Sequence, residues 1–438
     1  MLLSAPFLSC AGDAGPRLPA VVHVTDGDGQ IARVGTLLPA PIVATVLDPD
    51  GTPATGVRVT WRTADGRVLP VDAQTDAQGQ ARARWELGGS EGARTAEATL
   101  PGAAPAVFTA IAESRDALPF DDLTPLAFAT YDGSGQVVHP DYAATPAGAF
   151  GLPLHLAITP YPFGNAAFEN PSVFESPRKD RWTLPEGGPN PVVLPPAGYL
   201  SDPDLVYVAD LNELWLYYRQ VTSDNIVQLI RTADGRTWTA PVEVVRAPNH
   251  QIVSPSIVRR AIGDWWMFAV NSGQTGCGAS TTAVEVRRSQ DGIHWGDAVT
   301  AQLAQSDLWP WHIDVQWIPR LNRFWALYNV KTAGGCTTPA VYLAESTDGL
   351  DWQVVPQAVL VKGAIPELQD IVYRSTFEYD PLTDAVTFWF SGARWESGRY
   401  RWGAAVERRH RSALTEGFAA TLDPRELPPA PAPLVEWP

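Results

Sequence analysis

The sequence lacks both an excess of basic residues and a long apolar run. It has 32 Lys and Arg against 48 Asp and Glu, which gives a formal net charge of −16. This charge argues against a nucleic-acid partner, because phosphates are held mainly by Lys and Arg, and against electrostatic docking on anionic lipid. No apolar run reaches the roughly 18–20 residues that cross a bilayer as a helix. Compact metal-binding motifs such as H-E-x-x-H do not occur either.

The composition is that of a folded protein with more than one domain. Hydrophobic residues make up 45% of the chain and charged residues 18%, so the chain can bury a core and is not disordered. A length of 438 residues exceeds one ordinary hydrophobic core, and we therefore predict two or more domains.

The first ten residues, "MLLSAPFLSC", are apolar and end at Cys10. They resemble the end of a bacterial lipoprotein signal, although Phe7 stands where Leu is usual and a basic start is missing. We predict that residues 1–17 are the remnant of an export signal and that Cys10 is a lipidation site. The protein would then be periplasmic, anchored in the outer membrane through that lipid, or extracellular.

Residues 18–113 are predicted to form a β-sandwich. In "GVRVTW", Val57, Val59 and Trp61 share one face by the period of two, and strands of this kind recur about every ten residues between turn residues. The stretches "ATVLDPDGTPATGVRVTW" and "TDAQGQARARW" resemble bacterial Ig-like domains of the invasin type (Big-1). The resemblance implies a spacer or stalk, and residues 114–122 are predicted to be the linker that follows it.

A repeated motif dominates the rest of the chain. The sequence reads T-A-D-G-R-T-W, S-Q-D-G-I-H-W and S-T-D-G-L-D-W, and the tryptophans of these copies, Trp238, Trp295 and Trp352, are 57 residues apart. A degenerate copy ends at Trp182. Five units of four predicted strands over residues 123–425 indicate a five-bladed β-propeller, followed by a Pro-rich tail at 426–438. The fold class is therefore all-β, and the Asp-Gly motif, which resembles the Asp-box of sialidase-like propellers, is predicted to be a structural turn.

Polar residues recur near the start of the first strand of every predicted blade. These inner strands line the channel of a propeller, so their polar residues are expected to converge at one mouth. The aligned positions are His139 and Asp141, Asp202 and Asp204, Ser254 and Ser256, His312 and Asp314, and Tyr373 and Ser375. Two interpretations stay open: a ligand site, or hydrogen bonds to neighbouring strands and channel waters.

A long loop in the first blade, at residues 159–174, is expected to overhang this mouth. It carries Tyr161, Glu169 and Asn170, and such loops on a rigid scaffold often carry function. Together with the inner strands it defines the predicted substrate-binding residues. These are His139, Tyr161, Asn170, Trp311, His312, Asp314 and Arg374.

The five blades, the Asp-Pro at the start of an inner strand and the Asp-Gly hairpins resemble the five-bladed glycoside hydrolases of families 43 and 32. The resemblance implies that Asp141 is base or nucleophile and that Asp202, with Asp204 close by, orients or stabilises. The acid of those families is a Glu on the third blade, but the third blade here reads "IVSPSIV" without a Glu. Glu169 is the candidate for that role, so the predicted catalytic set is Asp141, Glu169, Asp202 and Asp204.

The predicted function is that of an exported carbohydrate-active protein, a glycoside hydrolase acting on a polysaccharide or oligosaccharide through carboxylates at the channel mouth. The alternative is a non-catalytic propeller that binds a glycan or a protein at the cell surface, and the missing third-blade Glu leaves catalysis itself open. No cofactor is predicted and no metal ligand is assigned. One structural divalent cation in the channel stays open, because His139, Asp141, His312 and Asp314 are suitable ligand types.

Two of the three cysteines occupy equivalent places. Cys277 and Cys336 lie in the loops between the second and third strands of the third and fourth predicted blades, 59 residues apart. Neighbouring blades would bring these loops together, so a disulfide is predicted, which suits an exported protein. Cys10 is then the unpaired cysteine.

Overall fold

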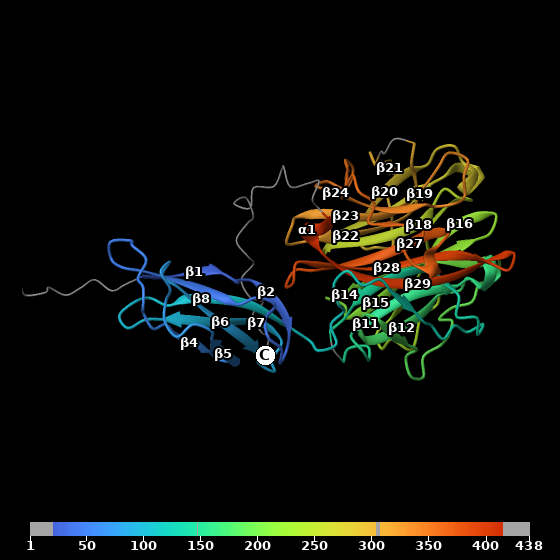
Figure 1. Ribbon diagram of the computed structural model, residues 1–438. Coiled ribbons are helices and arrows are strands. Elements are labelled where there is room, and N and C mark those ends of the chain that lie inside the picture. Colours follow the sequence, from blue (N-terminus) through green and yellow to red (C-terminus); the bar gives the residue numbers. More distant parts are fainter. Residues whose placement is uncertain (1–20, 147, 304–306, 415–438) are drawn as a thin grey trace, which may run out of the picture. The chain divides into compact units, whose positions relative to one another are not determined.

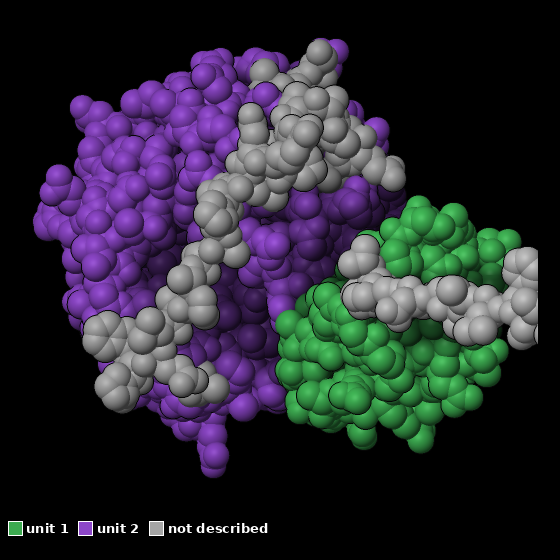
Figure 2. Space-filling view, turned by 90° about the vertical axis from the view of Figure 1, so that its left-hand side faces the viewer, with its two compact units in different colours: residues 1–117 green, residues 118–438 purple. Residues whose placement is uncertain are grey.

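The computed structural model describes residues 21–146, 148–303 and 307–414. The predicted export signal, Cys10 and the Pro-rich tail lie outside the described residues. The chain divides into two compact units, residues 1–117 and 118–438, which are coloured separately in Figure 2. Among the described residues, no helix has the length and apolar character needed to cross a membrane.

Unit 1 consists of two four-stranded sheets with one apolar core between their inward faces. Alternating residues supply this core, as in β6, where every second side chain is buried. The strand orders are β1-β3-β6-β5 and β2-β8-β7-β4. The strands are β1 (Val21–Asp26), β2 (Gln30–Arg33), β3 (Ile42–Leu47), β4 (Thr60–Thr63), β5 (Gly66–Pro70), β6 (Gln80–Leu87), β7 (Gly92–Thr99) and β8 (Ala106–Glu113). The assignment of this unit to the Ig-like class stays a prediction.

Unit 2 contains five antiparallel sheets, each the size of a propeller blade (Figure 1). Four of them are built from consecutive strands. The first has β10 (Val137–Ala144), β11 (Leu154–Pro160), β12 (Ser172–Arg178) and β13 (Arg181–Thr183); the second has β14 (Tyr199–Val208), β15 (Glu213–Val221), β16 (Asp224–Thr232) and β17 (Val242–Pro248). The third has β18 (Val253–Ala261), β19 (Asp264–Asn271), β20 (Ala283–Ser289) and β21 (Val299–Thr300); the fourth has β22 (Trp309–Ile318), β23 (Arg323–Lys331), β24 (Ala340–Ser346), β25 (Gln353–Val354) and β26 (Leu360–Val361).

The fifth sheet combines β27 (Ile371–Asp380), β28 (Ala385–Glu396) and β29 (Arg399–His410) with β9 (Thr124–Leu126) from the start of the unit. The short helical segments are η1 (Pro162–Gly164), η2 (Ala166–Phe168), η3 (Gly273–Gly278), η4 (Pro366–Leu368) and α1 (Arg411–Leu414).

The five sheets form a closed ring. Their first strands, β10, β14, β18, β22 and β27, each contact the next one, and β27 contacts β10. A ring of four-stranded sheets joined by their innermost strands is a five-bladed β-propeller, as the repeat predicts. The apolar cores lie between neighbouring blades, since one cluster joins Phe268 of β19 to Phe324 of β23.

The Asp-Gly motifs are structural turns, as predicted. In the second blade, Thr232 Oγ1 accepts the N–H of Gly235 at 2.9 Å, and Asp234 accepts the N–H groups that follow. Ser289 and Ser346 repeat this pattern in the next two blades. Each glycine has a positive φ and faces the preceding blade: a Cβ on Gly292 would lie 2.8 Å from the Tyr217 hydroxyl. Only glycine fits both conditions.

The ring is closed by a strand that the repeat does not reveal. The outer strand of the fifth blade was expected near the C-terminal end of the propeller, but β9 occupies that place and pairs with β29 between Thr124 and Val406 and between Leu126 and Ala404. The seam is reinforced nearby, where Asp121 N–H donates to the Arg408 carbonyl at 2.7 Å and Phe120 stacks on His410 at 3.7 Å. The two ends of unit 2 therefore hold the ring together.

A buried histidine of the first blade makes stability depend on pH. Burial, and then the charge of Arg236, lowers the pKa of His155 from 6.5 to about 4, while its Nε2 lies 3.1 Å from Thr145 Oγ1. The unfolded chain binds a proton at pH 4–6.5 where the folded chain does not, so stability is present above pH 6.5 and is lost as the pH falls towards 4. We expect this histidine alone to contribute a loss of about 2 kcal/mol between pH 7 and pH 5.

The measurement is urea unfolding of wild type and of His155→Gln at both pH values. Other buried histidines also destabilise the wild type in acid, so the prediction concerns the difference: the variant should lose about 2 kcal/mol less than wild type. Equal losses in both proteins would contradict it.

Candidate active site

Each inner strand is irregular where it enters the channel. The pairing with the second strand of the blade shifts register in all five blades, and His139, Asp202 and Ser254 have positive φ values of 57°, 50° and 53°. A bulge of this kind re-aims side chains and is common beside functional sites. Here it separates the polar residues of each strand into two layers, one at the mouth and one deeper in the channel.

The deeper layer contains Asp141, Asp204 and Asp314, whose carboxylate oxygens lie within 4.8 Å of one another. The oxygens of this layer accept hydrogen bonds from the next blade. These are Leu205 N–H to Asp141 at 2.6 Å, Ile257 N–H to Asp204 at 3.0 Å, and Val315 N–H to Ser256 Oγ at 2.9 Å. Burial, followed by mutual repulsion, raises the pKa of Asp141 well above its usual value. The groups of this layer therefore join neighbouring blades, and its three carboxylates are also close enough together to hold a metal ion.

Arg374 belongs to the same deeper layer. It is fully buried, its guanidinium lies 3.4 Å from Asp141 and 3.6 Å from Asp204, and it donates to the Pro203 carbonyl at 2.8 Å. These contacts favour a structural role for Arg374, Asp141 and Asp204, while the substrate-binding and catalytic roles given to them above stay predictions. The fifth inner strand keeps the expected alignment, because its register shifts between Val372 and Ser375, and Thr376 Oγ1 donates to Asp314 at 3.0 Å.

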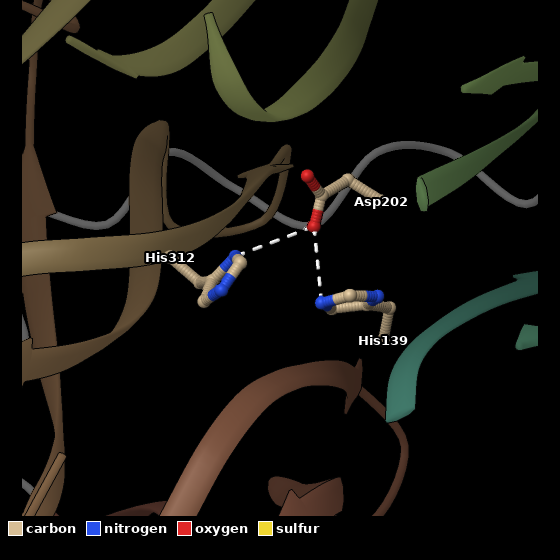
Figure 3. A group of neighbouring side chains, drawn as sticks. All are labelled: His139, Asp202 and His312. Atoms are coloured by element: carbon tan, nitrogen blue, oxygen red, sulfur yellow. Dashed lines mark ion pairs between the residues drawn. The ribbon is translucent and has the colours of Figure 1, made fainter. Parts of the chain in front are cut away.

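The mouth layer gathers His139, Asp202 and His312 around one oxygen atom. Asp202 Oδ1 lies 3.3 Å from His139 Nε2 and 3.3 Å from His312 Nδ1, and Figure 3 shows both rings turned towards that carboxylate. All three side chains are buried, with exposed fractions of 3%, 0% and 1%. They come from β10, β14 and β22, so three blades build one cluster.

The facing atoms of this cluster have no hydrogen-bond partner among the described residues. His139 Nδ1 lies 3.1 Å from Thr159 Oγ1, so a neutral ring with its proton on Nδ1 turns the lone pair of Nε2 towards a carboxylate. Two lone pairs that face each other in a buried site repel unless a positive charge lies between them. Asp202 Oδ1 lies 3.3 Å from each imidazole nitrogen, and ligands held about 2.0–2.2 Å from a tetrahedral cation lie at about this separation. The three residues therefore fit a divalent cation.

The protonation states suit the same ligand set. Burial lowers the pKa of His139 well below its usual value and also lowers that of His312, so both rings are neutral. Burial alone would raise the pKa of Asp202, but the charge of Arg219 beside it holds that pKa well below its usual range. Neutral imidazole and ionised carboxylate are the forms that bind metal. Two imidazoles favour a first-row transition metal over calcium or magnesium, which prefer oxygen ligands.

Glu169 reaches the cluster from the overhanging loop. Its Oε2 lies 3.5 Å from His139 Nδ1, and the residue is 5% exposed. Burial, and then the negative charge of Asp202, raises the pKa of Glu169 well above its usual value. Glu169 is therefore the group that holds a proton beside the cluster. The loop is fixed where the Glu169 carbonyl accepts the Leu200 N–H at 2.7 Å and Asn170 donates to the Tyr131 hydroxyl at 2.8 Å.

Two residues that the sequence reasoning missed complete the site. Arg219 Nε lies 2.8 Å from Asp202 Oδ2 and fixes that carboxylate; its only sequence signal is a basic residue inside the apolar strand "ELWLYYRQV". Tyr373 is one of the aligned channel residues, but the sequence suggested no role for it. Its aromatic ring lies 4.4 Å from that of His312, and its hydroxyl accepts a hydrogen bond from Trp311 Nε1 at 3.3 Å. An aromatic wall therefore stands beside the imidazoles.

A disulfide joins Cys277 and Cys336, with the Cα atoms 4.8 Å apart. It links the segment that follows β19 to the segment that follows β23, in the third and fourth blades. These segments leave the second strands at the same end of the blades as the site, because the second strands run towards the starts of the inner strands.

Comparisons with known proteins identify a curated relative by sequence and solved structures with a similar fold. No family model matches the chain. It is 27% identical over 307 residues to an A type blood N-acetyl-alpha-D-galactosamine deacetylase of Flavonifractor plautii, a match that covers 58% of this chain and 40% of the relative. The chain therefore spans less than half the length of that curated relative.

A crystal structure of an N-acetylgalactosamine deacetylase from F. plautii, in complex with blood group B trisaccharide, matches with a TM-score of 0.58 and 23% identity, over 66% of this chain and 94% of that chain. This likeness shows that the two share a fold. The structural neighbours also include a thermostable family-43 glycoside hydrolase, at a TM-score of 0.45 and 13% identity, over 62% of this chain and 88% of that chain.

Proposed function

We propose that this protein is a hydrolase that removes the acetyl group from an N-acetylated amino sugar of a glycan. The observation that carries the proposal is the set of His139, Asp202 and His312 around one point, with the protonated Glu169 beside it. Support comes from the similarity to a deacetylase of N-acetylgalactosamine. The glycan itself, an oligosaccharide or polysaccharide, is part of the proposal.

The chemistry of amide hydrolysis matches these groups. Water adds its oxygen to the acyl carbon, the C–N bond breaks, the amine nitrogen takes a proton and acetate leaves. A divalent cation held by the two imidazoles and Asp202 would polarise the acyl oxygen and acidify a water molecule. Arg219 and the Ser254 N–H, at 2.8 Å and 3.2 Å, hold Asp202 in place. We assign Glu169 as the proton donor to the amine, because its pKa is raised.

Aromatic side chains provide a place for the sugar. Tyr161 meets Trp402 edge to face at 5.0 Å, and Trp402 lies 5.2 Å from Tyr373. Rings of this kind pack against the apolar C–H face of a pyranose, while polar tips remain for its hydroxyl groups. The predicted substrate-binding residues Tyr161 and Trp311 belong to this wall and keep that role in the proposal.

Hydrolysis of a glycosidic bond is the second candidate. It is favoured by two buried carboxyls with opposite pKa shifts, Glu169 raised and Asp202 lowered, which is the pattern of an acid and its partner. However, the His139 ring lies between them, 3.5 Å from one and 3.3 Å from the other. An anomeric carbon would have to occupy the place of this ring, so the geometry favours amide hydrolysis.

The proposal also includes the location of the protein, which we place at the cell surface. Unit 1 would serve as an Ig-like spacer, and the protein would be exported and attached to a membrane through a lipid on Cys10. The disulfide between Cys277 and Cys336 supports an oxidising compartment, where glycans are accessible. Labelling with a radioactive fatty acid in a bacterial host, with Cys10→Ser as the control, tests the anchor.

The function is tested by incubating the protein with N-acetylated oligosaccharides and measuring acetate and reducing sugar separately. Acetate without reducing sugar is the expected result. Reducing sugar without acetate would replace this proposal by the glycosidase. If neither product forms but the protein binds the oligosaccharides, the non-catalytic alternative holds.

Removal of the cation gives an independent prediction. Dialysis against a chelator should reduce acetate release at least about tenfold, since second-shell changes alone cost 10–100-fold in metal sites, and a first-row divalent metal should restore it. Mass spectrometry of the undenatured protein should show one metal ion per chain before dialysis. Full activity in metal-free protein would contradict the role of the cluster as a cation site.

A further inference from the structure

The hairpin formed by β28 and β29 extends beyond the rest of its blade. The inner strand β27 begins to pair at Ile371, opposite Ala393. The hairpin continues past this point with the pair Trp395 and Tyr400, and β27 begins at the mouth end of the channel. Trp395 is 57% exposed, so a large indole projects into solvent on the side of the active site.

Ring contacts connect this indole to the active site. Trp395 meets Tyr400 edge to face at 4.9 Å, and Tyr400 lies 6.4 Å from Trp402. Trp402 lies 5.2 Å from Tyr373, whose ring is 4.4 Å from His312. The spacings are those of packed aromatic pairs. The aromatic wall is therefore continuous from the histidine cluster to the tip of the hairpin.

The surroundings of Trp395 have the character of a sugar site. The backbone N–H of Trp395 donates to Asp370 Oδ2 at 2.5 Å, which fixes the backbone of the hairpin at this residue. Arg394 and Glu396 flank it and pair with each other at 3.4 Å. A sugar residue combines an apolar face of C–H groups with a rim of hydroxyls, so an exposed indole bordered by both charges complements it. Single exposed apolar residues are common on protein surfaces and do not by themselves indicate a binding site. Trp395 differs because it extends the row of aromatic side chains that begins at the histidine cluster.

We propose that Trp395 and Tyr400 form a second carbohydrate subsite, which stacks on a sugar residue of the glycan beyond the one that reacts. This inference rests on the proposed function for the identity of the reacting sugar. It assigns oligosaccharides, rather than free amino sugars, as the preferred substrates. The binding energy would come from a part of the substrate that does not react.

The experiment compares two probes, free N-acetylgalactosamine and an oligosaccharide that carries it at one end. In Trp395→Ala, kcat/KM for the oligosaccharide should fall about tenfold more than kcat/KM for the monosaccharide. Trp395→Phe should recover most of the difference, because a ring remains. Leu194→Ala, which removes another exposed side chain at 65% exposure, should leave the ratio of the two constants unchanged. Equal losses on both probes, or no loss, would overturn the subsite while leaving the deacetylase intact.

Binding separates this inference from the function on which it rests. If wild type releases no acetate from either probe, the proposed function fails, and calorimetric titration with the same oligosaccharide decides the subsite. A Kd raised about tenfold in Trp395→Ala supports it. The same Kd in both proteins, or no binding by wild type, overturns it.

Discussion

In Asp202→Asn, kcat/KM for acetate release should fall by about 10³-fold or more. The carboxylate supplies the only charged ligand of the mouth cluster, and a cation contributes several kcal/mol of charge stabilisation, with each factor of ten equal to about 1.4 kcal/mol. The amide of asparagine keeps the shape but removes the charge that holds both the cation and Arg219, 2.8 Å away. Metal content should fall with activity, which mass spectrometry would record.

Asp204→Asn is the matched control for this variant. It makes the same chemical change two residues along the same strand, β14. Asp204 accepts the Ile257 N–H at 3.0 Å and faces Arg374, so its loss should lower the melting temperature while acetate release stays within a factor of about three, as for residues that do not touch substrate. If Asp204→Asn abolished turnover and Asp202→Asn did not, the two layers of the channel would have the opposite roles.

In Glu169→Gln, kcat should fall by about 10²–10⁴-fold, the usual contribution of a general acid. Glutamine fills the same volume and still offers a donor to neighbouring groups, but it cannot transfer a proton to the amine. KM should change little, because the side chain would act in the reaction rather than in holding the sugar. Steady-state acetate release at varied substrate concentration measures both constants.

Glu175→Gln provides the control for a buried glutamate outside the site. Glu175 lies in the same blade, is 6% exposed and accepts from Arg236 at 3.2 Å. Its replacement should affect stability and leave turnover unchanged. A Glu169→Gln protein with wild-type turnover would show that the proton comes from another group.

The propeller fold could be read from the sequence because an intact motif marks three of the five repeats and a degenerate copy marks a fourth. The 57-residue spacing of Trp238, Trp295 and Trp352 fixes the blade length, and Ser/Thr-x-Asp-Gly has one satisfactory hydrogen-bond pattern. The strand that closes the ring could not be read in this way. β9 has three residues and no motif, and its partner β29 lies at the other end of the unit.

The convergence of the site could be predicted, but its division into two layers could not. Alternation places residues i and i+2 on one face of a regular strand, and on this basis His139 was grouped with Asp141. The strand is not regular there: His139 has a φ of 57° and the register shifts between Val138 and Asp141. Positive φ is enriched in histidine and aspartate, but it stays uncommon even for them, so the residue type alone does not reveal it. As a result, His139 faces Asp202, while Asp141 faces Arg374.

The closure of the ring has a mechanical consequence. β9 follows the segment that connects the two units, so tension along that segment would load the three-residue pairing with β29 before any other part of the ring. Such tension would arise under the proposed anchoring at Cys10 with a bound glycan at the propeller. Phe120, which stacks on His410, and Asp121, which donates to the Arg408 carbonyl, precede β9 in the chain. A pulling force would therefore break these two contacts before it separates β9 from β29 and opens the ring.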